Sequence, residues 1–309
     1  MKVHLFGATS SPAVAQYCLR QVASRADDDT VDCIQRNMYV DDCLRSEDSV
    51  ADAVRVITQL CPLLKSGGFH LTKFISNNVD VLAQVPEQDR ASNVQNLDLG
   101  NCGKEYALGV IWNISNDHLE VRTDLQPREL TRRGLASMTA QVYDPFGFLA
   151  PFILPAKLLL QELTRLELSW SDNVAEPHRS QFLKWANSLQ QLRSLFFPRC
   201  YKPPGFVPIR IQLHNFSDAS KSGYSACSYL LFTDANNNVH VSFVRGLARV
   251  VPKNCPTIPR LELVAAVAAV KLAREILKDI TYRIDEVYYW TDSTAVLQCI
   301  RTKRVRFHH

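Results

Sequence analysis

The stretch Ile209-Arg210-Ile211-Gln212-Leu213-His214-Asn215-Phe216-Ser217-Asp218 decides the fold of the second half of this chain. Apolar residues at 209, 211 and 213 alternate with polar ones, which predicts a strand with one buried face, and the stretch ends on an aspartate. The elements predicted after it are strands at 224–232 and 239–244, an alanine-rich helix over 260–277, a strand at 287–290 and a helix starting near Ser293. Three strands in a meander, followed by helix, strand and helix, predict a domain built on a mixed sheet.

The first 200 residues have mainly helical spacing, with short strands between the helices. We expect helices over 12–23, with Ser11 as the cap, and over 47–65 and 178–195, with helical segments within 128–168. We also expect a hairpin at 34–45 that turns at Asp41 and Asp42, and strands near 69–75, 106–112 and 118–121. Residues 201–208 contain three prolines and a glycine, which predicts a linker between the two halves.

Three carboxylates of the second half end or begin these predicted elements. Asp218 and Asp292 each follow a strand, and Glu262 falls in the first turn of the predicted helix. Singly, a strand-end aspartate usually forms a turn or caps a helix, and a first-turn glutamate usually serves the helix dipole. Together, in this order, they predict convergence on divalent cations, and carboxylates without a His/Cys set favour Mg²⁺ or Mn²⁺. Such a site would hydrolyse a phosphodiester.

Several segments carry a specific resemblance. FSDAS (216–220), PRLEL (259–263) and WTDS (290–293) resemble the ribonuclease H domain of BEL/Pao-type LTR retrotransposon polyproteins. The segments that are similar to the polymerase palm and thumb of the same family are VHLFGATSSP (3–12), YVDD (39–42), GFHLTKFISN (68–77), LGVIW (108–112) and YDPFGFLAP (143–151). The resemblance covers essentially the whole chain.

The resemblance implies an α+β and α/β fold class: part of a reverse transcriptase palm and thumb, then a ribonuclease H-like mixed-sheet domain. The implied boundaries are palm 1–125, thumb and connection helices 126–200, linker 201–208, and a C-terminally incomplete ribonuclease H-like domain 209–309. The implied activities are RNA-directed DNA synthesis and cleavage of the RNA strand of an RNA–DNA hybrid. Partners would be the hybrid or another duplex, and other segments of the polyprotein.

The resemblance also assigns residues. Asp218, Glu262 and Asp292 would bind the ribonuclease H metals, Asp41 would be the polymerase metal ligand, and Asp42 would support it. Residues 245–309 hold 12 Lys/Arg against 6 Asp/Glu, a balance that fits a polyanion partner or simply a solvated face. The residues expected to contact nucleic acid are Tyr39, Trp112, Arg260, Arg301, Lys303 and Arg304.

The family places a first polymerase aspartate before the LFGATSSP segment and a fourth ribonuclease H aspartate beyond His309. We therefore expect a truncated polyprotein that is inactive alone in both reactions. A non-enzymatic nucleic-acid-binding remnant is one alternative. A DDE-type integrase, which shares the ribonuclease H fold, is another, although that class draws its glutamate from a later helix.

Composition limits the class of protein and the cellular compartment that we expect. Hydrophobic residues make up 46% of the chain and charged residues 21%, as in ordinary globular proteins. The nine cysteines are odd in number and form no CxxC pair, which favours reduced thiols in a cytoplasmic or nuclear compartment. The most apolar region, 146–160, is interrupted by Pro151, Pro155 and Lys157, so we expect no membrane span.

Overall fold

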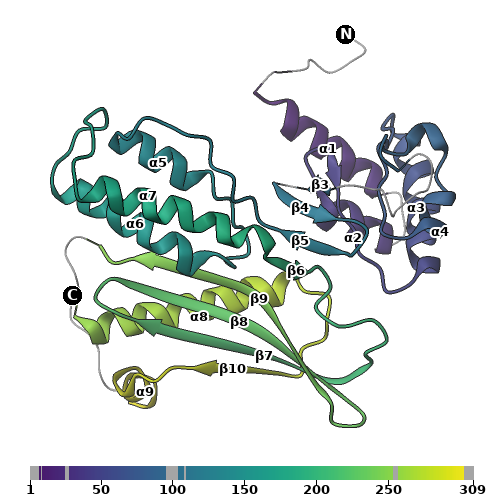
Figure 1. Ribbon diagram of the computed structural model, residues 1–309. Coiled ribbons are helices and arrows are strands. Elements are labelled where there is room, and N and C mark those ends of the chain that lie inside the picture. Colours follow the sequence, from purple (N-terminus) through teal and green to yellow (C-terminus); the bar gives the residue numbers. More distant parts are fainter. Residues whose placement is uncertain are drawn as a thin grey trace. The chain divides into compact units, whose positions relative to one another are not determined.

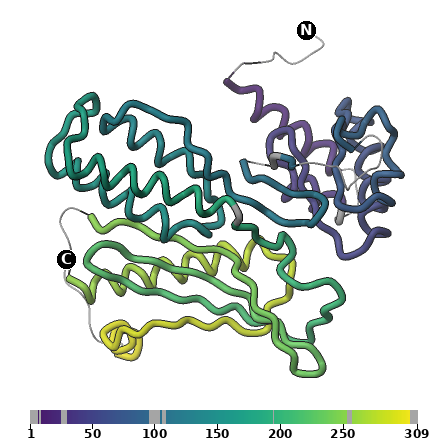
Figure 2. The backbone as a smooth tube through the Cα atoms, viewed as in Figure 1, coloured from purple at the N-terminus to yellow at the C-terminus, as the bar shows by residue number. Residues whose placement is uncertain are grey.

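The computed structural model describes residues 7, 9–24, 28–94, 104–107, 109–252 and 257–302 (Figure 1). The chain forms two compact units, traced as a tube in Figure 2. Unit 1 comprises Met1–Glu105 and Asn113–Asn116, and unit 2 comprises Tyr106–Trp112 and Asp117–His309.

Unit 1 is mainly helical. Its elements are α1 (Ser11–Ala23), α2 (Asp28–Asn37), β1 (Met38–Tyr39), β2 (Asp42–Cys43), α3 (Val50–Ser66), α4 (Val79–Ala83) and the 3-10 turn η1 (Glu87–Asp89). Leu19, Ile34 and Leu64 lie in its buried core. Helix α3 begins after Ser49, whose hydroxyl accepts the backbone N–H of Asp52 at 3.1 Å.

Two predictions for unit 1 are wrong. The segment expected to be a strand near 69–75 forms only an isolated bridge between Phe74 and Arg90, because alternation without a partner strand does not build a sheet. The hairpin expected over 34–45 is shorter, since residues 34–37 complete α2. Met38 pairs with Cys43 and Tyr39 with Asp42, so the turn consists of Val40 and Asp41 rather than Asp41 and Asp42.

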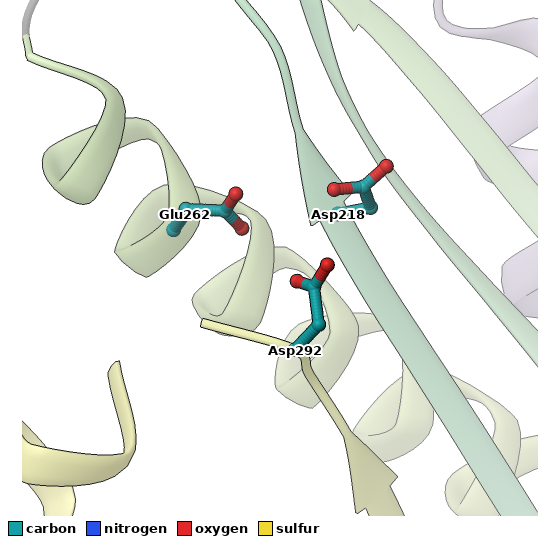
Figure 3. A group of neighbouring side chains, drawn as sticks. All are labelled: Asp218, Glu262 and Asp292. Carbon is teal, nitrogen blue, oxygen red and sulfur yellow. The ribbon is translucent and has the colours of Figure 1, made fainter. Parts of the chain in front are cut away.

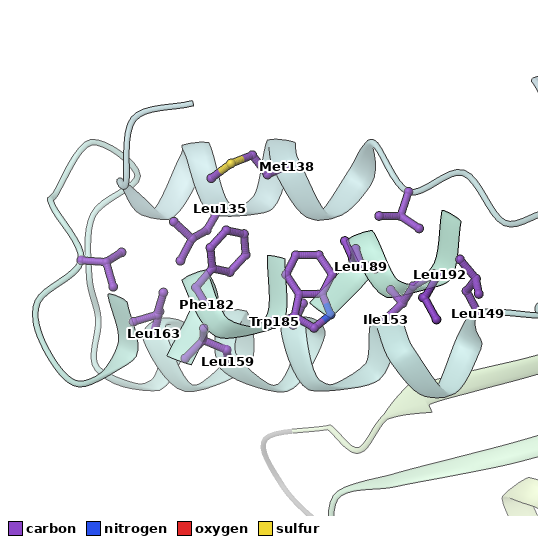
Figure 4. Packing of buried hydrophobic residues seen from close by; sticks show 13 residues of the cluster. Leu135, Met138, Leu149, Ile153, Leu159, Leu163, Phe182, Trp185, Leu189 and Leu192 are labelled. Carbon is purple, nitrogen blue, oxygen red and sulfur yellow. The ribbon is translucent and has the colours of Figure 1, made fainter. Parts of the chain in front are cut away.

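Residues 132–194 of unit 2 form helices that pack around a dense apolar core (Figure 4). The elements are α5 (Arg132–Ala140), α6 (Ala150–Arg165), α7 (His178–Ser188) and the 3-10 segment η2 (Leu189–Ser194). Leu135, Phe182 and Leu189 are fully buried in this core, and the Trp185 indole donates to the carbonyl of Phe152 at 2.7 Å. The helix predicted over 178–195 therefore ends earlier and tightens into a 3-10 turn.

A small sheet has the order β3-β4-β5-β6. It contains β3 (Lys104–Ala107), β4 (Val110–Asn113), β5 (His118–Glu120) and β6 (Phe196–Pro198). Asp117, which precedes β5, accepts two hydrogen bonds from the Arg199 guanidinium, at 2.6 and 2.8 Å. Burial alone would raise the pKa of Asp117, but the bonds from Arg199 and Trp112 outweigh it and hold the pKa below its ordinary value.

The main sheet of unit 2 has the order β10-β7-β8-β9. Its strands are β7 (Pro208–Ala219), β8 (Gly223–Asp234), β9 (Val239–Val250) and β10 (Glu286–Trp290). Helix α8 (Ile258–Asp279) connects β9 to β10, and α9 (Thr294–Arg301) follows β10. Strands β7, β8 and β9 are antiparallel, and β10 pairs with β7 in parallel. Leu213, Leu230 and Leu272 are core residues between the sheet and α8. The predicted mixed sheet is thus confirmed.

The helices and the main sheet of unit 2 touch through two glycines. The Gly246 N–H donates to the carbonyl of Phe146 at 2.8 Å. A Cβ on Gly147 would lie 2.0 Å from the Gly246 carbonyl oxygen, and Gly147 has a φ of +80°. Only glycine fits such a close approach of two backbones. The domain boundaries drawn from the sequence at 125, 200 and 208 stay a prediction.

Candidate metal centre

Strand register places two of the three predicted carboxylates side by side. In the parallel pair β7–β10, Trp290 lies opposite Phe216. Asp292 and Asp218 each follow two residues later. Asp218 is the penultimate residue of β7, and Asp292 lies just beyond the last residue of β10, so both aspartates lie at the same end of this parallel pair.

Glu262 arrives from α8, which packs on β7 and β8. The sequence suggested a first-turn position, but α8 begins at Ile258, with a proline in its first positions, so Glu262 lies in the second turn. Leu261 and Ala265, its neighbours on the buried side of the helix, are 1% and 0% exposed. This packing holds the Glu262 side chain at the end of β7.

The three side chains converge, as the sequence predicted. Asp218, Glu262 and Asp292 each offer a carboxylate oxygen, and these oxygens all lie within 4.8 Å of one another. Figure 3 shows the carboxylates, carried by β7, α8 and the end of β10, facing a common space. In the described parts of the chain, no other group of three His, Cys, Asp or Glu side chains meets this geometry.

The electrostatics of this cluster are unfavourable without a cation. Asp218 and Asp292 are exposed, whereas Glu262 is only 9% exposed. Burial, followed by the charges of Asp218 and Asp292, raises the pKa of Glu262, and a hydrogen bond from the backbone of Ala219 only partly offsets this. The Glu262 Oε2 atom is buried and has no hydrogen-bond partner. A buried anionic oxygen without a donor is costly, and a divalent cation would satisfy it. The residues therefore fit Mg²⁺ or Mn²⁺.

Asn215 is a supporting residue that the sequence reasoning did not single out. Its side chain is fully buried, donates to the Tyr288 carbonyl at 3.0 Å and accepts the Ser228 hydroxyl at 2.6 Å. It thus joins β7 to both neighbouring strands and fixes β10 ahead of Asp292. The alternation of the strand could have pointed to this residue, because Asn215 follows the buried positions 211 and 213 at the same two-residue spacing. A polar side chain at a buried position needs hydrogen-bond partners.

The predicted polymerase residues lie on the β1–β2 hairpin of unit 1. Tyr39 is 63% exposed, and Asp41 and Asp42 are both exposed. Val40 has a φ of +55°, a conformation that a β-branched residue rarely adopts. Within the described residues, Asp41 and Asp42 join no third metal-binding side chain.

The predicted nucleic-acid contacts are scattered. The Trp112 indole donates to Asp117 at 2.9 Å, and the Arg199 guanidinium lies 5.8 Å from the Trp112 ring centre. Arg260, at the start of α8, and Arg301, at the end of α9, are exposed. Lys303 and Arg304 lie outside the described residues. The assigned roles of these residues, and of Tyr39, stay predictions.

In the described part of the chain, no helix is both long and apolar enough to cross a membrane. No curated protein sequence matches the chain.

Two solved structures are similar in fold. One is a foamy viral protease-reverse transcriptase in complex with dsDNA, with a TM-score of 0.50 and 14% identity over 98% of this chain and 55% of that chain. The other is the dRH form of that protein with double-stranded DNA, with a TM-score of 0.48 and 14% identity over 88% of this chain and 42% of that chain. This chain thus spans about half the length of these structures, and the likeness concerns the fold alone.

The model of the Pao retrotransposon-like RNaseH-like domain family matches residues 131–293. The match runs from the start of α5 to the residue after Asp292, so it includes the helical layer, the main sheet and all three carboxylates. Since this is more than half of the chain, the protein belongs to the Pao retrotransposon family and carries its RNaseH-like domain.

Proposed function

We propose that unit 2 is a ribonuclease H-type centre, which binds divalent cations through Asp218, Glu262 and Asp292 and acts on the RNA strand of an RNA–DNA hybrid. One observation carries the proposal: three carboxylate oxygens lie within 4.8 Å of one another, and a buried oxygen of Glu262 lacks any hydrogen-bond partner. Anionic oxygens packed this closely repel each other unless cations lie between them.

Each residue has a distinct task in this proposal. Glu262, buried and fixed by α8, supplies a rigid oxygen ligand, while the exposed Asp218 and Asp292 supply ligands that remain open to an incoming phosphate. Asn215 holds β10 against β7, which keeps Asp292 close to Asp218. Bound Mg²⁺ or Mn²⁺ would activate a water molecule and stabilise the leaving oxygen of the phosphodiester.

Unit 1 has reverse transcriptase ancestry in the same proposal. Support comes from the Tyr39–Asp42 hairpin, which presents two carboxylates at an exposed turn, and from the fold likeness of the chain to a protease-reverse transcriptase. Asp41 would be a polymerase metal ligand and Asp42 its support. The hybrid duplex is the proposed partner, together with other segments of the polyprotein, in a reducing intracellular compartment.

The test is a single-turnover assay with the chain in excess over a hybrid labelled on its RNA strand. We expect at most weak cleavage of the RNA strand by the chain alone, and any cleavage should need Mg²⁺ or Mn²⁺, stop in EDTA and be absent from the Asp292→Asn variant. The matched control is Asp279→Asn, an exposed aspartate at the end of α8, which should cleave like the wild type. Bound Mn²⁺ is measured in parallel. If Asp292→Asn binds Mn²⁺ as tightly as the wild type, the proposal is wrong.

A further inference from the structure

An aromatic groove adjoins the carboxylate cluster on the sheet of unit 2. It has a volume of about 780 Å³ and shares Asp218 and Asp292 with the cluster. The aromatic side chains that line it are Phe148, Phe197, Phe216, Tyr229, Phe243 and Trp290. Along β7, side chains alternate between the two faces of the sheet, and Phe216 is three residues from Leu213. Leu213 faces the core that α8 covers, so Phe216 and the groove lie on the other side of the sheet.

Two rings of this groove are exposed at its carboxylate end. Phe216 is 41% exposed and Trp290 is 48% exposed. Their ring centroids lie 6.2 Å apart, and the ring planes differ by only 15°. The Trp290 indole N–H also lies 3.0 Å from Nδ1 of His214, whose ring is nearly parallel to that of Trp290. Trp290 is therefore held in a defined orientation by a neighbour while much of its surface faces solvent.

Strand β7 sets the spacing between the Phe216 ring and Asp218, and Trp290 lies opposite Phe216 at the end of β10. Phe216 and Trp290 each precede an aspartate of the cluster by two residues. Two residues of a strand span about 6.6 Å. This is comparable to the distance between a phosphate and the base of the same nucleotide. If a cation holds a phosphate of a nucleic-acid strand at the carboxylates, the base of that nucleotide can therefore lie against Trp290.

We propose that this groove binds an unpaired nucleobase of the strand whose phosphate lies at the carboxylate cluster, so that the site accepts a single-stranded end or a frayed base. The inference rests on the proposed function. Bases inside a duplex are stacked on both faces, so only an unpaired or terminal base offers a free face to an aromatic ring. Such stacking is tolerant of sequence and contributes about 1–3 kcal/mol per base.

The test uses a short single-stranded DNA that contains 2-aminopurine, whose fluorescence falls when the base stacks. DNA is chosen because the proposed cleavage acts on RNA. In Mg²⁺, we expect the wild type to quench the probe and Trp290→Leu to bind it at least about fivefold more weakly, the equivalent of about 1 kcal/mol, with little quenching. The matched control is Trp170→Leu. Trp170 is also 48% exposed but lies under Arg132, outside the groove, so this variant should behave like the wild type.

Three results would overturn the inference. The first is equal binding and quenching by the wild type and Trp290→Leu. The second is quenching that EDTA leaves unchanged, because the base would then sit without its phosphate anchor. The third is a wild-type dimer that Trp290→Leu converts to a monomer in sedimentation velocity, which would show that a second copy covers the groove. Thermal melting confirms that both variants fold. Failure of the proposed function is separate: it appears as Mn²⁺ binding that Asp292→Asn leaves unchanged.

Discussion

The two acidic sites of this chain differ in how they are built. Asp41 and Asp42 are neighbours in sequence and lie on one exposed hairpin, whereas Asp218, Glu262 and Asp292 come from two strand ends and a helix separated by up to 74 residues. In the hairpin, solvent hydrates both carboxylates. In the cluster, packing of α8 on the sheet buries Glu262 beside two other acids and leaves one of its oxygens without a donor.

Acidic residues alone therefore do not make a metal centre. An exposed pair is already satisfied by water, so a cation gains little there. A convergent, partly buried set is destabilised until a cation arrives, and the tertiary structure therefore supplies part of the binding free energy in advance.

The largest effect is expected on cation affinity. Glu262→Gln should weaken Mn²⁺ binding by more than about 100-fold, because loss of a direct ligand should exceed the cost of losing a group that merely orients one. Asp41→Asn should leave this affinity unchanged, since the hairpin pair has no third ligand among the described residues. Isothermal titration calorimetry measures both variants. Equal losses in the two variants would remove the distinction between the sites.

Asn215→Leu should destabilise unit 2 by about 2 kcal/mol, because the Tyr288 carbonyl and the Ser228 hydroxyl lose a buried partner. It should also weaken Mn²⁺ binding, since β10 positions Asp292. Urea unfolding followed by Mn²⁺ titration reports both effects. The control is Asn236→Leu in the exposed β8–β9 turn. Weakened stability with unchanged cation affinity would show that Asn215 only supports the fold.

Glu262 should also give the chain a pH dependence in EDTA. Because the folded state raises the pKa of Glu262, it disfavours the charged form of this carboxyl. This penalty is absent below the ordinary pKa of a glutamate, where the group is protonated in both states. The chain therefore loses stability as the pH rises through the folded-state pKa. Glu262→Gln should therefore melt at a higher temperature than the wild type at neutral pH, and the two melting temperatures should approach each other near pH 4. A constant difference across this range would contradict the repulsion inferred for the cluster.

The smallest effect is expected in the hairpin. Val40→Gly should stabilise unit 1 by about 1 kcal/mol, because relief of a positive φ at a β-branched residue exceeds the added entropy of the unfolded chain. Val40 is 58% exposed, so little burial is lost. Thermal unfolding measures the change, and Mn²⁺ binding should stay the same. A less stable variant would mean that packing of the Val40 side chain outweighs the strain.

The sequence predicted features whose signal is local. Asp218 and Asp292 were found because each follows an apolar strand, and the order of the elements around them gave the mixed sheet. The start of α8 was missed because Pro259 resembles a loop residue, although proline is favoured in the first turn of a helix.

Other features depend on partners distant in the chain. Nothing around Asn215 shows that Ser228 and the Tyr288 carbonyl lie within reach of its side chain, because that depends on the order of the strands. The strand expected at 69–75 is wrong for the same reason, because its only bridge in the described residues pairs Phe74 with Arg90. The aromatic groove combines side chains from the loop before α6, from β6 and from the main sheet. These segments are far apart in the sequence, so no repeating pattern of residues could have predicted the groove.

The most direct test of the metal centre is anomalous diffraction from crystals of the chain soaked in MnCl₂. We predict an anomalous peak bounded by the carboxylates of Asp218, Glu262 and Asp292, with the Glu262 Oε2 atom among its ligands. No such peak should appear at Asp41 and Asp42 under the same conditions. Manganese bound at the hairpin, with none at the cluster, would contradict the account.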